Sequence, residues 1–146
     1  MERIDHLLPW SSLGSERRLS VFRYGKGPRK VYIQSSLHAD ELPGMRTAWE
    51  LKQRLADLES RGQLNCVVEL VPVANPVGLG QTLQASHLGR FEFASGKNFN
   101  RDFVELSALV AERVGDKLGA DEAANVELIR QAMRDGLDAL PPASSE

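Results

Sequence analysis

The chain has 146 residues, 42% of them hydrophobic and 26% charged, which is enough apolar material for one domain with its own core. Eighteen basic residues stand against twenty acidic ones, so the formal net charge is −2. That balance excludes the strongly basic composition typical of nucleic-acid-binding domains.

The composition also bounds the cellular context. Cys66 is the single cysteine, which excludes an internal disulfide and a cluster of cysteine ligands. Residues 1–10 alternate charged and apolar side chains and do not resemble a secretory signal. No apolar run approaches the roughly 18 residues that a membrane span needs. We therefore expect a cytoplasmic protein that binds neither nucleic acid nor membrane, and its oligomeric state is left open.

Two strands are predicted first along the chain. Residues 18–24 alternate polar and apolar side chains, as a half-exposed strand does. Residues 30–35 are rich in β-branched and aromatic types, and the turn-forming residues 25–28 separate the two segments. This pattern predicts a hairpin or an adjacent antiparallel pair.

A helix and a buried strand follow. Pro43 suits the first turn of a helix, Asp40 could cap it, and Gly62 suits its end. Residues 66–73 form a continuous apolar strand of the kind that is buried on both faces of a sheet. Strand, helix and strand at this spacing predict a βαβ unit. The helix is indicated by apolar residues at steps of three and four: Met45, Ala48, Leu51, Leu55 and Leu58.

The second half of the chain has a different character. Residues 74–101 are glycine-rich and show no period, which predicts a long functional loop. Two helices are predicted around 106–114 and 128–137, the second capped by Asp121. Because strand-forming sequence stops before residue 74, we expect the buried strand at the edge of the sheet, with its missing neighbour supplied from outside this segment. The fold class is therefore an incomplete α/β fold.

His38 and Glu41 form the first candidate site, at the predicted junction between a strand and a helix. Open α/β sheets bind ligands at such junctions, and an imidazole and a carboxylate three residues apart can hold one zinc ion together. The structural alternative is that Glu41 lies at the helix N-terminus for electrostatic reasons and His38 is a polar residue at a strand end.

Asn100 and Arg101 form the second candidate site. A guanidinium beside an amide suits the bidentate binding of a carboxylate. The alternative is a helix start, with Asn100 or Asp102 as its cap. For Asn75 and Pro76 we infer only that they end the central strand.

Taken in order, these motifs resemble the succinylglutamate desuccinylase/aspartoacylase family, a branch of the metallocarboxypeptidase-like zinc hydrolases. The resemblance covers residues 31–103. It implies a three-layer fold with a mixed β-sheet and flanking helices, zinc-carboxypeptidase-like (phosphorylase/hydrolase-like), of which residues 1–140 are the N-terminal part and 141–146 a linker-like tail.

The resemblance also implies residue roles. His38 and Glu41 match the first two zinc ligands, and Arg90 matches an arginine that polarises the scissile carbonyl. Asn100 and Arg101 match the pair that binds the substrate carboxylate, and Asn98 is expected to help shape the pocket. The implied activity is zinc-dependent cleavage of the amide bond of an N-acyl amino acid or a similar small peptide-like substrate.

Two departures from the family pattern stand out. The family usually has Gly-x-His-Gly-Asn-Glu, whereas this chain has Ser36, Ala39 and Asp40 at the corresponding positions. The third zinc ligand and the general base have no match before Glu146, so the chain by itself is expected to be a truncated, inactive piece. Two alternatives stay open: a metallocarboxypeptidase acting on peptides or cell-wall fragments, and a non-catalytic carboxylate-binding domain.

Overall fold

The protein was analysed as a computed structural model that describes residues 1–9 and 14–141. The described residues form two compact units, and the boundary between them follows Arg101. Each unit is described by itself below.

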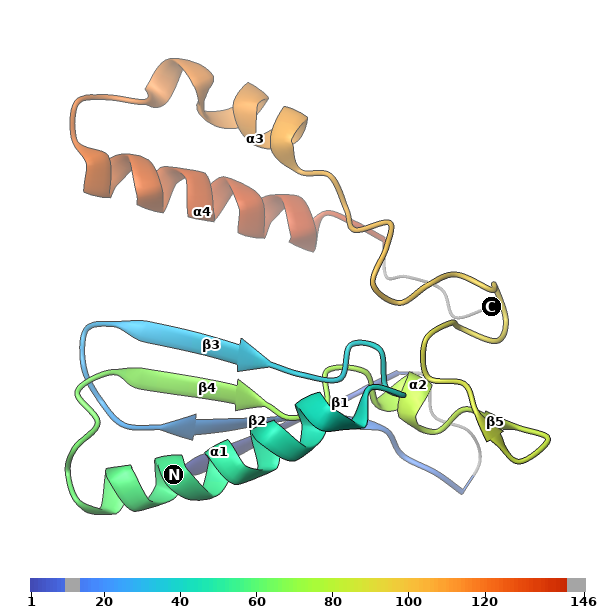
Figure 1. Ribbon diagram of the computed structural model, residues 1–146. Helices are drawn as coiled ribbons and strands as arrows, with labels where there is room; N and C mark the ends of the chain where they lie inside the picture. The colour runs from blue at the N-terminus through green and yellow to red at the C-terminus, as the bar shows by residue number, and fades with distance from the viewer. Residues whose placement is uncertain (10–13, 142–146) are drawn as a thin grey trace. The chain divides into compact units, whose positions relative to one another are not determined.

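The first unit is built on a mixed four-stranded sheet (Figure 1). Its strands lie in the order β1 (Glu2–Leu7), β2 (Arg18–Tyr24), β4 (Val67–Val71) and β3 (Lys30–Gln34). β3 and β4 run parallel, whereas β1 with β2 and β2 with β4 are antiparallel. The predicted α/β class with a mixed sheet is therefore confirmed. The three-layer, zinc-carboxypeptidase-like arrangement stays a prediction, as does the domain boundary at residue 140.

The strand order corrects two expectations. β2 and β3 are not neighbours, because β4 pairs with both of them, Leu70 lying opposite Phe22 on one side and Ile33 on the other. The buried strand is consequently central and not at the edge; the edge next to it is β3. Strand β1 was not predicted, because charged residues interrupt its apolar ones.

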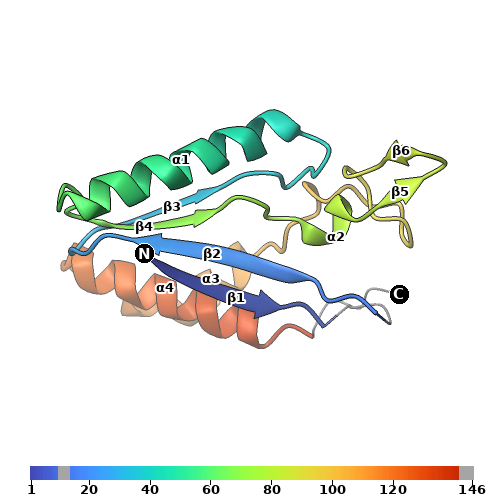
Figure 2. The same ribbon diagram turned by 90° about the horizontal axis from the view of Figure 1, so that it is seen from below.

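Helix α1 (Leu42–Ser60) covers one face of this sheet, as Figure 2 shows. The predicted helix and the parallel βαβ unit are confirmed. The predicted cap is wrong: Glu41 is the N-cap residue, and no side-chain hydrogen bond caps the helix. Gly62 follows the helix with φ +67°, the left-handed region that favours glycine. The helix and the sheet share a buried apolar cluster of Phe22, Tyr24, Ala48, Leu55, Val68 and Leu70.

The segment after β4 is more ordered than a structureless loop. It holds the short helix α2 (Pro76–Leu79) and a two-stranded hairpin of β5 (Thr82–Leu83) and β6 (Ser86–His87). A further turn brings Phe91 opposite Asn98 in an antiparallel bridge. The loop therefore folds back twice before the second unit begins.

The second unit is a helical hairpin of α3 (Ser107–Val114), a 3₁₀ turn (Gly115–Lys117) and α4 (Glu122–Asp138). Both predicted helices are confirmed. So is the Asp121 cap, whose carboxylate accepts hydrogen bonds from the backbone N–H groups of Ala123 and Ala124. The predicted linker-like tail lies outside the described residues from position 142 on. None of the helices described in either unit is long and apolar enough to cross a membrane.

Candidate active site

The candidate site lies in the loops that leave the carboxyl ends of β3 and β4. Because these strands are parallel, their ends meet at one edge of the sheet. The backbone N–H of Ser35 donates to the carbonyl of Val71 at 3.0 Å, and the N–H of Ala74 donates to the carbonyl of Ser35 at 2.9 Å. These two bonds keep the loops side by side beyond the last paired residues.

Asn75 fixes the loop that carries His38. Its side-chain amide donates to the carbonyl of Leu37 at 3.0 Å, and its side-chain oxygen accepts from the N–H of Gly78 at 2.7 Å. Asn75 is buried, so both hydrogen bonds are shielded from water. Its role thus goes beyond ending the strand, which is all that we inferred from the sequence.

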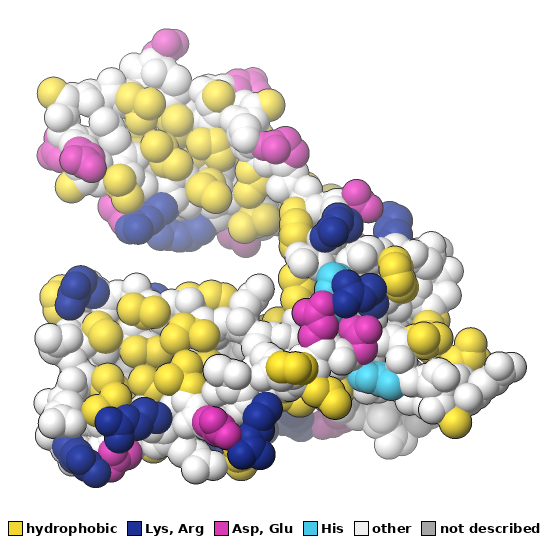
Figure 3. All heavy atoms as spheres, viewed as in Figure 1, with side chains coloured by type: hydrophobic (Ala, Val, Ile, Leu, Met, Phe, Trp, Pro, Cys, Tyr) yellow, Lys and Arg dark blue, Asp and Glu magenta, His cyan; other side chains and the backbone are white. Residues whose placement is uncertain are grey.

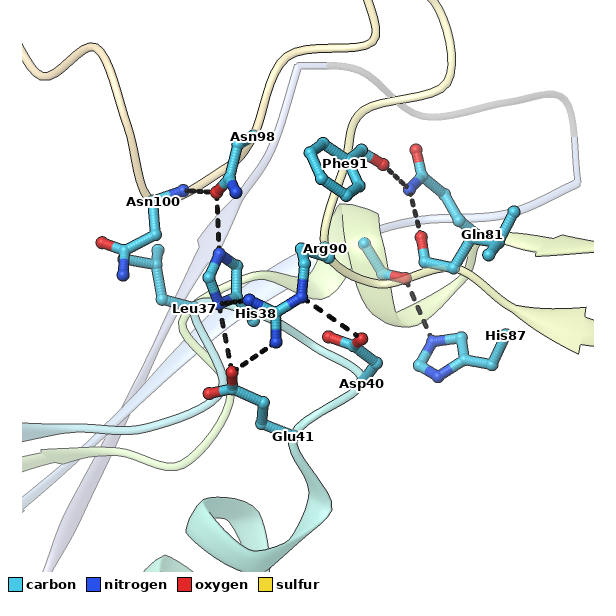
Figure 4. Close-up of polar contacts among 12 residues, drawn as sticks. Leu37, His38, Asp40, Glu41, Gln81, His87, Arg90, Phe91, Asn98 and Asn100 are labelled. Atoms are coloured by element: carbon cyan, nitrogen blue, oxygen red, sulfur yellow. Dashed lines mark hydrogen bonds and ion pairs between the residues drawn. The ribbon is translucent and has the colours of Figure 1, made fainter.

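Gly89 brings a second loop against the first. Its carbonyl accepts from the N–H of Ala39 at 2.9 Å, and a Cβ at position 89 would lie only 2.5 Å from the backbone nitrogen of Asp40. A larger residue would push the two backbones apart. This close approach places the next residue, Arg90, beside His38 (Figure 4).

The hydrogen bonds of His38 define its tautomer. Its side chain is buried, with 6% of its surface exposed. Nδ1 lies 2.9 Å from Nη1 of Arg90, and Nε2 lies 2.7 Å from the side-chain oxygen of Asn98. Since a guanidinium only donates, Nδ1 must accept and Nε2 must carry the proton that Asn98 receives. The ring therefore presents a lone pair at Nδ1.

Glu41 directs one carboxylate oxygen to the same point. Oε1 lies 3.2 Å from Nδ1 of His38 and accepts a hydrogen bond of 2.6 Å from Nη2 of Arg90. The bond from Arg90 lowers the pKa of the Glu41 carboxyl below its ordinary value, because the guanidinium favours the charged form of the carboxylate. Two electron-pair donors thus converge on one cationic group.

This donor set fits a zinc ion. In tetrahedral zinc sites with metal–ligand bonds near 2 Å, two ligand atoms lie about 3.3 Å apart. The distance of 3.2 Å between His38 Nδ1 and Glu41 Oε1 matches that value. In the part of the chain that the structure describes, however, no three His, Cys, Asp or Glu side chains group closely enough to hold a metal ion. The chain offers two ligands, and a catalytic zinc site ordinarily has three.

Asn98 connects the two predicted motifs. Its side-chain oxygen accepts from the backbone N–H of Asn100 at 2.8 Å as well as from Nε2 of His38. Arg101 is exposed, and Nη1 of its guanidinium donates to the carbonyl of Asn100 at 2.6 Å. The structure therefore brings His38, Glu41, Arg90 and the backbone of Asn100 together, while the Arg101 side chain contacts its neighbour's backbone. The substrate-binding roles of Asn100 and Arg101 stay predictions.

Gln81 was not singled out from the sequence. Its buried side chain donates to the carbonyls of Leu88 at 2.9 Å and Phe91 at 2.7 Å, and its oxygen accepts from the N–H of Phe93 at 3.0 Å. These bonds brace the loop on both sides of Arg90. No sequence signal could have identified this role, because every partner is a backbone group.

His87 lies in the same loop but serves another contact. Its Nε2 donates to the carbonyl of Gly78 at 3.2 Å, which satisfies the ring nitrogen nearest the backbone of α2. Figure 4 shows its ring apart from the cluster around His38. It is therefore no substitute for a third ligand.

Comparison with known proteins supports the family resemblance. No family model and no curated protein matches the sequence. A solved structure of a candidate succinylglutamate desuccinylase/aspartoacylase from Shewanella frigidimarina NCIMB 400 is 22% identical, with a TM-score of 0.77; the match covers 94% of this chain and 37% of that protein. A candidate member of the same family from Shewanella amazonensis SB2B is 25% identical, with a TM-score of 0.62; the match covers 91% of this chain and 43% of that protein. The predicted resemblance is confirmed, and the chain spans less than half the length of these relatives.

Proposed function

We propose that the chain is part of a zinc-dependent hydrolase that cleaves the amide bond of an N-acyl amino acid in the cytoplasm. One observation carries the proposal. The lone pairs of His38 Nδ1 and Glu41 Oε1 converge, 3.2 Å apart, at the carboxyl edge of a mixed sheet. They do so in a chain that resembles solved desuccinylase/aspartoacylase family structures.

His38 and Glu41 would hold the zinc ion in this proposal. Bound zinc would supply a Lewis acid and lower the pKa of a coordinated water toward neutrality. The chain's own contribution is to keep the imidazole in the required tautomer, because Asn98 accepts a hydrogen bond from Nε2–H at 2.7 Å and so keeps the lone pair of the ring at Nδ1. The third ligand and the general base would come from outside the described residues.

Arg90, Asn100 and Arg101 would contact the substrate. Arg90 lies beside both ligands and would stabilise the negative charge that develops on the scissile carbonyl oxygen. Arg101 and Asn100 would bind the substrate carboxylate and so orient the amide toward the metal. The exposed guanidinium of Arg101 is accessible for this purpose.

The resemblance to solved structures favours this substrate class over its rivals. Both Shewanella proteins carry a deacylase family description, which supports a small acylated amino acid more than a peptide or a cell-wall fragment. The convergence of the His38 and Glu41 donors supports a metal-dependent enzyme more than a domain that binds carboxylates without a metal, because an imidazole nitrogen and a carboxylate oxygen are ligands of catalytic zinc sites.

An amide-hydrolysis assay on the complete polypeptide encoded by the gene tests the proposal. Release of free amine from N-acetylaspartate, N-succinylglutamate and a C-terminal dipeptide substrate is followed with and without zinc. We expect release from the N-acyl amino acids, lost on chelation, and a fall of about a hundredfold or more in kcat/KM for His38→Ala and Arg90→Ala. Arg46→Ala is the matched control, since this exposed arginine pairs with Glu50 on the same helix, α1, and with no other acidic side chain that the structure describes. Activity that survives His38→Ala would overturn the proposal.

A further inference from the structure

The guanidinium of Arg90 is hydrogen-bonded to the two atoms that would bind a metal. Nη1 donates to His38 Nδ1 at 2.9 Å, and Nη2 donates to Glu41 Oε1 at 2.6 Å. Its third nitrogen, Nε, lies 3.8 Å from the carboxylate of Asp40. The arginine is thus held from three sides, and two of its partners are the proposed zinc ligands (Figure 4).

These contacts exclude a metal at the same atoms. An imidazole nitrogen has one lone pair in the plane of its ring, so Nδ1 can accept from Arg90 or bind a cation, but not both. The other ring nitrogen cannot bind the metal instead, because Nε2 carries a proton and donates to Asn98 at 2.7 Å. A dication placed between His38 and Glu41 would also meet the guanidinium's positive charge at close range, where like charges repel.

We propose that Arg90 competes with zinc for His38 and Glu41, and that metal binding transfers the guanidinium from the ligands to the substrate side of the site. The inference rests on the proposed function, since it takes the same two residues as zinc ligands. Arg90 then acts twice. Without a metal, its guanidinium is hydrogen-bonded to His38 and Glu41. Once a metal has displaced it from these two residues, it becomes available to a substrate carbonyl.

Asp40 is positioned to bind the displaced guanidinium. Its carboxylate already lies 3.8 Å from Nε, and the preceding residue, Ala39, is hydrogen-bonded to the carbonyl of Gly89 at 2.9 Å. The family pattern has asparagine at this position, and its replacement by Asp40 supplies the negative charge that this role needs. A carboxylate beside the site retains the arginine at the rim after it has left His38 and Glu41.

Zinc titration of the complete polypeptide encoded by the gene, followed by calorimetry, tests the competition without an activity assay. Removing the competitor should tighten binding, so we expect Arg90→Gln to lower the zinc Kd by about tenfold, in the ordinary range of coupling between two ligands. Arg90→Lys keeps the charge but has a single nitrogen in place of Nη1 and Nη2, which bond to His38 and Glu41. It should lower the zinc Kd by a smaller factor. Arg101→Gln is the matched control, because among the described residues its guanidinium bonds to the carbonyl of Asn100 and to neither proposed ligand, and the zinc Kd should stay unchanged.

A second measurement reads the transfer directly. In the unaltered chain, zinc should shift the NMR signal of the Arg90 Nε–H group, and the Arg101 signal should stay in place. Circular dichroism establishes that each variant is folded.

The outcomes separate the two proposals. If neither the unaltered complete polypeptide nor its Arg90→Gln variant binds zinc, or if His38→Ala binds it equally well, the proposed function fails. If binding requires His38 but Arg90→Gln binds zinc no more tightly, the competition is refuted and the proposed function stands.

Discussion

The Nε2–H of His38 donates to the side-chain oxygen of Asn98, a residue sixty positions further along the chain, at 2.7 Å. The same oxygen accepts from the backbone of Asn100 at 2.8 Å, which fixes the amide and through it the ring. Outer partners of this kind orient metal ligands and set their basicity.

Replacement of Asn98 tests that role. Asn98→Ala removes the acceptor and should weaken zinc binding by about 10- to 100-fold, the usual cost of losing such a partner. Asn98→Asp keeps an oxygen at the same place and should retain the affinity. Calorimetric Kd values for both variants give the answer, and equal weakening in the two would contradict it.

Gly89→Ala tests the close approach of the two loops. The added Cβ would lie 2.5 Å from the nitrogen of Asp40 and 2.7 Å from the carbonyl carbon of Ala39, so one backbone must move. We expect a loss of about 2 kcal/mol in the free energy of unfolding, measured in urea, as for other overpacked sites. Gly80→Ala is the control, because its nearest neighbour would lie at an ordinary 3.6 Å. Similar losses in both variants would disprove the steric account.

Ser36 offers a stabilising substitution. It has φ +59°, its side chain is buried, and its hydroxyl has no hydrogen-bond partner among residues 1–9 and 14–141. Glycine, which the family has here, would relieve a left-handed strain of about 1–2 kcal/mol and remove the unpaired hydroxyl. After the entropic cost of glycine, Ser36→Gly should raise the free energy of unfolding by about 1 kcal/mol. A lower melting temperature than that of the unaltered chain would show the reverse.

Glu69 should make stability depend on pH. Hydrogen bonds from Lys30, and next from Arg23, lower the pKa of its carboxyl in the folded protein. A lowered pKa means that the stabilisation is present above the unfolded-state value and is lost as pH falls through the folded value. Glu69→Gln should therefore be less stable than the unaltered chain at pH 7, and the difference should shrink below about pH 4.5, the ordinary glutamate value. A difference that stays constant across the urea titrations at pH 7 and pH 3 would rule this out.

The elements of the fold were largely predictable, and their order was not. The period of α1 and the apolar run of β4 are local properties of the sequence, so both were found. The insertion of β4 between β2 and β3 depends on long-range pairing, which no local pattern encodes.

Some residues of the candidate site could likewise be predicted from the sequence, and others could not. His38 and Glu41 could be found together because they lie three residues apart across one turn. Arg90 entered through the family resemblance, and Asn98 was expected only to shape the pocket. The contacts of Asn75 and Gln81 with backbone groups leave no mark in residue type or spacing, and so only the structure shows them.

The central place of β4 has a consequence for how the chain folds. Of the four described strands of this sheet, β4 is synthesised last, and it joins β2 and β3, which do not pair with each other. Until Val71 has emerged from the ribosome, β1–β2 is the one described strand pairing of this sheet that can be completed, and the Leu37 carbonyl has no Asn75 to hold it. The geometry around His38 is therefore a late product of folding, acquired only after the most distant pairings of the sheet are complete.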